Sequence, residues 1–86
     1  MDNQELTAEE INQHFSAMDD SVNLINDTIA DDTQALEMFG SAEEVKLMMK
    51  RNTDHLELQL VKDWAVADNR DKSSYTAAIT AGLAYI

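Results

Sequence analysis

The chain contains no proline and only two glycines, Gly40 and Gly82, among its 86 residues. Sheet proteins reverse direction through tight turns, which rely on glycine, proline or Asn-Gly pairs. Helical proteins need far fewer such residues, so the sequence predicts an all-α fold. The composition is 44% hydrophobic and 27% charged, which is enough apolar material for one small core. We therefore expect a single helical domain over residues 1–86.

The first predicted helix begins at a capping box, Thr7–Glu10, and residues 1–6 before it are expected to form a flexible N-terminus. Apolar residues then recur at spacings of four, three, four, three and four. This stripe, with a repeat near 3.5 residues, consists of Ile11, Phe15, Met18, Val22, Ile25 and Ile29. A stripe of this kind predicts a helix that packs along one face.

The end of this helix is left open by the sequence. Asp27, Asp31 and Asp32 are weak helix formers and good caps, which favours an end near Ala30 and a short helix from Thr33. The alternative is one helix that continues to Phe39. Gly40 then supplies the left-handed position that commonly ends a helix, and a second capping box, Ser41–Glu44, follows at once. This order predicts a long helical hairpin around Gly40.

The second long helix is expected to carry an apolar band that ends either at Trp64 or as far along as Ala67. Its members are Val45, Met48, Met49, Asn52, Leu56, Leu60 and Trp64. Asn52 either fixes the register of this helix or lies at the rim of the band. Residues 68–74 form a polar linker, and a last helix from there to Ile86 packs across the other two. The expected fold is a small three-helix bundle, with a short fourth helix if the first one breaks.

The net charge of -11 is concentrated at one end of the sequence. Residues 1–40 hold ten acidic residues and no Lys or Arg, whereas residues 41–86 hold seven acidic and six basic residues. Such an acidic field repels nucleic acid and anionic lipid, so we expect neither as a direct partner. No apolar run approaches the roughly 18 residues that a membrane span requires.

Two charged groups are the candidate partner-binding residues. The acidic group comprises Glu9, Asp19, Asp20, Asp27, Asp31 and Asp32, and the basic group comprises Lys46, Lys50 and Arg51. The acidic residues form either a solvated face that maintains solubility, a surface for a basic partner protein, or a mimic of DNA phosphates. The basic residues are expected to pair with acids such as Glu43, Glu44 and Asp54.

No arrangement of residues in the sequence indicates catalysis, a cofactor or a metal. There is no cysteine, no glycine-rich loop and no nucleophile motif. Glu10 and His14 are one helical turn apart, a spacing that can chelate a metal, but two residues do not make a site and a solvated histidine is expected. His55, at the edge of an apolar band, is expected to be half-buried and hydrogen-bonded between helices. We therefore expect a protein that is not an enzyme.

The C-terminal part of the chain resembles small uncharacterised proteins of tailed bacteriophages and prophages. The resemblance rests on residues 51–58 (RNTDHLEL), on Trp64 and on residues 77–86 (AAITAGLAYI). It implies a phage-encoded protein in the bacterial cytoplasm or in the virion, acting in assembly or as an inhibitor of a host protein. It also implies that Arg51, Asn52, His55 and Leu56 are positions of interest.

The sequence thus favours a small acidic protein-interaction or structural module. A homo-oligomer is a second hypothesis, because the stripe of the first helix could pair with a copy of itself. The alternative function is a DNA mimic, or another inhibitor of a host protein, that acts through the acidic first helix.

Overall fold

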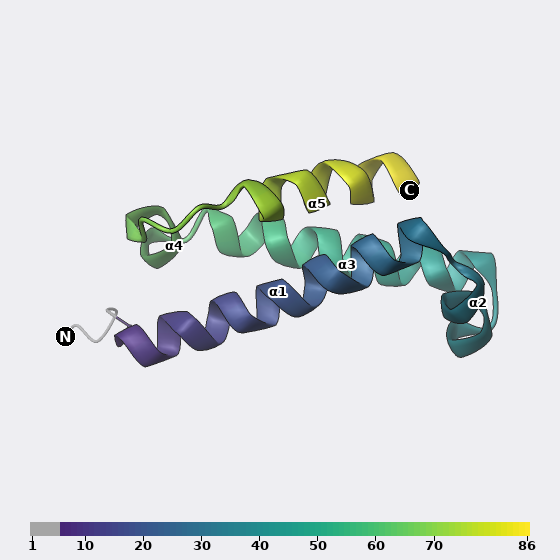
Figure 1. The fold of residues 1–86 in the computed structure, drawn as a ribbon, viewed down its shortest axis with the longest axis horizontal. Coiled ribbons are helices and arrows are strands. Elements are labelled where there is room, and N and C mark those ends of the chain that lie inside the picture. Colours follow the sequence, from purple (N-terminus) through teal and green to yellow (C-terminus); the bar gives the residue numbers. More distant parts are fainter. Residues whose placement is uncertain (1–5) are drawn as a thin grey trace.

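The computed structural model describes residues 6–86, which form five helices and no strand. The helices are α1 (Ala8–Ala30), α2 (Thr33–Phe39), α3 (Ala42–Leu60), α4 (Asp63–Ala67) and α5 (Ser73–Tyr85). Helices α1, α3 and α5 pack against one another, and α3 runs opposite to the other two (Figure 1). The predicted all-α bundle is confirmed. The expected flexible N-terminus, residues 1–6, lies outside the described residues except for Leu6.

Helix α1 begins and ends where local hydrogen bonds replace those of the helix. At its start, the Glu10 amide donates to Thr7 Oγ1 at 3.1 Å, and the Thr7 amide donates to Glu10 Oε1 at 2.9 Å. This is the predicted capping box. At its end, Asp31 adopts an extended conformation and its carboxylate accepts from the Thr33 amide at 3.0 Å. The helix therefore breaks after Ala30, and the first of the two alternatives is confirmed.

The hairpin between the long helices contains α2 and the glycine predicted from the sequence. Gly40 has a φ of +92°, which is the left-handed conformation, and its amide donates to the Leu36 carbonyl. The Ser41 hydroxyl then accepts from the Glu44 amide at 3.2 Å. The second capping box is only half formed, because the exposed Glu44 carboxylate does not return a bond to the Ser41 amide. An exposed carboxylate gains little from that bond, since water already solvates it.

The prediction of one helix through Trp64 and Ala67 was wrong. Helix α3 ends at Leu60, and Lys62 is extended before the five-residue α4 begins. The Lys62 amide donates to the Gln59 carbonyl, which tightens the last turn. The break turns α4 back toward α1, so that Trp64 packs edge-on against Phe15, with 5.4 Å between the ring centroids. Tertiary packing of this aromatic pair outweighs the continued helical pattern.

The core lies between α1, α3 and α5. It contains Phe15, Met18, Val22, Ile25, Ala35, Val45, Met48, Met49, Leu56, Ala65, Tyr75 and Ala78. Ile29 is 44% exposed, so the last position of the predicted stripe lies outside the core. Because its other members pack within the chain, this stripe is not a free surface for a second copy.

The register of α3 differs slightly from the predicted one. Thr53 is fully buried and its hydroxyl donates to the Met49 carbonyl at 2.8 Å. Asn52 is half-buried and donates to the Met48 carbonyl at 2.8 Å. Asn52 therefore lies at the rim, as one of the two interpretations held. Helix α3 is thus rotated about its axis so that Thr53 faces Gly82 of α5. A Cβ added at Gly82 would lie 2.1 Å from Thr53 Oγ1.

Candidate partner-binding groove

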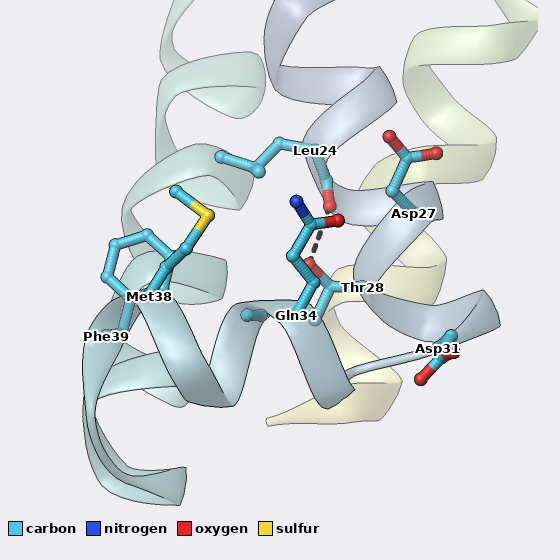
Figure 2. Close-up of a pocket in the computed structure, with 8 residues that line it drawn as sticks. Leu24, Asp27, Thr28, Asp31, Gln34, Met38 and Phe39 are labelled. Carbon is cyan, nitrogen blue, oxygen red and sulfur yellow. Dashed lines mark hydrogen bonds between the residues drawn. The ribbon is translucent and has the colours of Figure 1, made fainter.

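A groove of about 230 Å³ lies between the C-terminal part of α1 and the helix α2 (Figure 2). Figure 2 shows Met38 and Phe39 at one side of it and Asp27 and Asp31 at the other, with the Gln34 amide between them. The lining residues are Leu24, Asp27, Thr28, Asp31, Gln34, Ala35, Met38 and Phe39. The groove is thus apolar along one side and acidic along the other.

The break after Ala30 creates this groove, because it lets α2 fold back beside α1. Asp31 holds the turn through its bond to the Thr33 amide, and that bond lowers the pKa of the Asp31 carboxyl below its ordinary value. The Thr28 hydroxyl donates to the Leu24 carbonyl at 2.8 Å (Figure 2). The Thr28 hydroxyl is therefore satisfied within its own helix, as a buried polar group needs to be.

The apolar side of the groove is accessible to a partner. Met38 is 70% exposed and Phe39 is 37% exposed, although α2 is only seven residues long. Exposed apolar side chains that stand together mark contact surfaces more often than isolated ones do. Methionine is also flexible and polarizable, so it adapts to partners of different shape.

The six acidic candidate residues do not form one face. Glu9 and Asp20 are exposed on α1 outside the groove, and Asp19 accepts a hydrogen bond from the Tyr75 hydroxyl at 2.7 Å. Burial and this bond to Asp19 raise the pKa of Tyr75 to about 12. Asp32 is the N-cap residue of α2 and is half-buried. Only Asp27 and Asp31 line the same groove.

The basic candidate residues also separate. Lys46 and Lys50 line a second groove, of about 310 Å³, together with Glu43, Leu47 and Ile86. Lys50 forms an ion pair with Asp54 at 2.8 Å, as predicted, and this bond raises the pKa of the Lys50 ammonium. Arg51 is exposed and is not part of the lining of this groove.

Sequence reasoning missed a cluster that holds the predicted linker 68–74 against α1. Arg70 donates to Asp68 at 2.7 Å and to Asn12 at 2.9 Å, and its guanidinium lies 3.9 Å from the centroid of the Phe15 ring. The bond from Arg70 lowers the pKa of Asp68. The Asp68–Arg70 spacing indicates a local turn, but nothing in the sequence pairs Arg70 with Asn12, 58 positions away.

The two histidines have structural surroundings. His14 is exposed, as expected, and its ring also stacks on Trp64 with 4.8 Å between the ring centroids. His55 is half-buried, as expected, but its Nε2 atom is buried and has no hydrogen-bond partner within residues 6–86. The same residues contain no group of three or more potential ligands that could hold a metal ion.

Comparisons with protein-family models, with curated proteins and with solved structures give no match to this chain. Within the part of the chain that the structure describes, no helix combines the length and the apolar character needed to cross a membrane.

Proposed function

We propose that this protein is a protein-interaction module, and not an enzyme, that binds a basic and apolar segment of a partner protein in the α1–α2 groove. The observation that carries the proposal is the juxtaposition of exposed Met38 and Phe39 with the carboxylates of Asp27 and Asp31. The apolar side chains supply contact area, and the carboxylates select the charge of the partner.

The size of the groove favours a side chain over a small-molecule ligand. Pockets for cofactors and drug-sized ligands enclose about 300–1,000 Å³ and cover most of the ligand. The α1–α2 groove, at about 230 Å³, is smaller and open to solvent. It suits one apolar side chain of a partner segment, inserted between Leu24 and Met38.

The charge of the chain favours Lys or Arg beside that apolar side chain. The net charge of -11 and the ten acidic residues in positions 1–40 create a field that attracts basic partners and speeds their encounter. Asp27 and Asp31 then place two carboxylates at the groove itself. A patch of this size supports a weak or transient complex more readily than an obligate one.

The proposal is tested with a probe peptide in which Arg residues flank a central Leu, and with a control peptide in which Glu replaces each Arg. Nuclear magnetic resonance titration of the full chain should show shifts at Met38, Phe39 and Gln34 with the Arg peptide only. Two variants should each weaken binding by about tenfold, the effect of losing roughly 1.4 kcal/mol of contact: Asp27→Lys and Met38→Ser.

Matched controls separate a groove from general charge attraction. Asp20→Lys makes the same charge change on the same helix at an exposed position, and Val66→Ser removes an apolar side chain of α4 that is 69% exposed. Both controls should bind the Arg peptide nearly as well as the natural chain. If Asp20→Lys weakens binding as much as Asp27→Lys, the acidic face acts only through its total charge and the groove proposal fails.

The alternative of a DNA mimic receives less support from the geometry. Mimicry needs an array of free carboxylates at phosphate-like intervals, whereas Asp19 and Asp31 already accept hydrogen bonds within the chain.

The role of a phage virion or assembly protein stays a prediction from the resemblance of residues 51–86. Capture of a partner with the natural chain, but not with Met38→Ser, would identify the protein that the groove serves.

A further inference from the structure

The second groove has the opposite character to the first. It lies between the N-terminal half of α3 and the end of α5, and its lining contains Lys46 and Lys50 beside the apolar Leu47 and Ile86. Leu47 is 45% exposed and Ile86 is 47% exposed, so both present apolar surface to solvent. We call this the lysine groove.

The two grooves of one chain are complementary to each other. The α1–α2 groove joins two carboxylates to exposed apolar side chains, and the lysine groove joins two ammonium groups and one carboxylate, that of Glu43, to exposed apolar side chains. The existing ion pair of Lys50 with Asp54 opposes a new contact only slightly, because exposed pairs four residues apart contribute little. Lys50 can therefore exchange Asp54 for a carboxylate of another molecule.

We propose that the lysine groove binds the α1–α2 groove of a second copy of this chain. The elements that line the two grooves, α2 with the end of α1 and the start of α3 with the C-terminus, lie at the end of the molecule away from α4 (Figure 1). Two copies related by a two-fold axis can then make the same contact twice, which closes the pair instead of extending it into a filament. The inference rests on the proposed function, because it takes the α1–α2 groove as a docking surface.

The contact is small, so the pair is weak. Perpendicular to its long axis the molecule measures 22 × 17 Å, and an end-to-end contact covers less than the roughly 800 Å² per partner of a standard interface. The net charge of -11 on each copy also opposes association. We expect a Kd on the order of 0.1 mM. A partner segment that binds the α1–α2 groove more tightly displaces the second copy, so self-association regulates access to the groove.

The test exchanges charges between the two grooves of the full chain. Lys46→Glu alters the lysine groove, and Asp27→Lys alters the α1–α2 groove without touching the Asp31 cap. Sedimentation and diffusion measurements up to about 1 mM, well above the expected Kd, should show pairs for the natural chain. Each variant alone should pair at least about tenfold more weakly, whereas an equal mixture should form a mixed pair, because the two reversed charges meet each other.

Two controls carry the same charge changes at exposed positions away from the grooves. Lys62→Glu lies next to α4, and Asp20→Lys lies in the middle of α1, and both should pair as the natural chain does. A natural chain that stays monomeric at about 1 mM overturns the inference, and so does a mixture that fails to restore pairing.

Peptide binding is tested separately from self-association, because the Arg peptide is titrated into a dilute solution in which the chain is monomeric. Binding of that peptide without self-association would overturn only the further inference. Self-association without peptide binding would overturn only the proposal that the α1–α2 groove binds a basic segment of a partner protein. If both occur, increasing the peptide concentration should convert pairs to monomers, and persistence of the pairs at saturating peptide would contradict a shared groove.

Discussion

The two ends of this molecule differ in how their side chains are used. At the end that contains α4 and the linker, which we call the closed end, Arg70 bonds to Asn12 and the Tyr75 hydroxyl bonds to Asp19. At the other end, which we call the open end, Met38, Leu47 and Ile86 are exposed around charged residues. Figure 1 shows α4 at the closed end and α2 with the C-terminus at the open end.

The two ends differ in whether their polar side chains already have hydrogen-bond partners in distant parts of the chain. Among the described residues, both side-chain hydrogen bonds that join distant parts of the sequence lie on the side of α1 that faces the linker and the start of α5. The ion pair near the open end, Lys50–Asp54, is local to one helix and exposed. Groups already bonded within the chain have little to offer a partner, whereas exposed charges beside apolar surface do. The closed end therefore carries the long-range side-chain bonds and the open end carries the two grooves proposed for binding, although Leu58, Val61 and Val66 are also exposed near α4.

The largest test of this division replaces the same residue type at each end. Phe15 is 1% exposed and packs on Trp64, Tyr75 and Arg70, so Phe15→Ala should lower the free energy of unfolding by about 3–5 kcal/mol. Phe39 is partly exposed beside the groove, so Phe39→Ala should cost only about 1 kcal/mol and weaken binding of the Arg peptide. Chemical denaturation of both variants checks this, and equal losses would contradict the division.

The next test compares the two glycines. A Cβ at Gly82 would lie 2.1 Å from Thr53 Oγ1, and the bond to the Met49 carbonyl holds that hydroxyl in place. Gly82→Ala should therefore cost about 1–3 kcal/mol through overpacking, even though alanine favours helices. A Cβ added at Gly40 would meet no atom within 4 Å, but this residue needs a positive φ, so Gly40→Ala should cost about 1 kcal/mol.

A second substitution identifies the cause of the loss at Gly82. Thr53→Ala removes the clashing hydroxyl, so the double variant Gly82→Ala with Thr53→Ala should be more stable than the sum of the single effects indicates. The same Thr53→Ala change should give no such recovery with Gly40→Ala, because Gly40 is constrained by backbone conformation. If the losses in the free energy of unfolding at positions 53 and 82 are additive, the added Cβ at position 82 does not clash with Thr53, and α5 shifts away from α3 to accommodate it.

The sequence predicted the elements of this fold because local chemistry determines them. The Thr7 capping box, the acid-rich break before Thr33 and the left-handed Gly40 each act within a few residues. The apolar spacing of α1 also identified Phe15, Met18, Val22 and Ile25 as core positions. Such features can be predicted from one sequence, since no distant part of the chain is needed to form them.

The missed end of α3 and the missed burial of Thr53 depend on residues that are distant in sequence. The end of α3 at Leu60 follows from the contact of Trp64 with α1, and the buried position of Thr53 follows from its contact with Gly82. Asp27 and Asp31 were named as candidates only for their charge. Their place beside Met38 became visible once α2 folded back on α1. Periodicity gives the face of a helix but not its neighbour.

The Tyr75 hydroxyl gives a pH-dependent test of the closed end. Its pKa is raised to about 12 by burial and by its bond to Asp19. Because the folded pKa lies above the ordinary value of 10.0, the stabilisation is fully present below about pH 10 and is lost as the pH rises toward 12. Unfolding measured across this range should show the loss, and Tyr75→Phe should remove the part that depends on Tyr75. An unchanged profile in Tyr75→Phe would assign the loss to other groups.

The smallest expected effect compares one cation at each end. Arg70→Gln removes the bonds to Asp68 and Asn12 and the contact with the Phe15 ring, so it should lower the melting temperature measurably. Lys50→Gln removes one exposed pair within α3, so its melting temperature should stay close to that of the natural chain. Lys50→Gln should instead weaken self-association, which Arg70→Gln should leave intact. If the two substitutions exchange these effects, the closed end binds and the open end stabilises, and the division of the molecule is reversed.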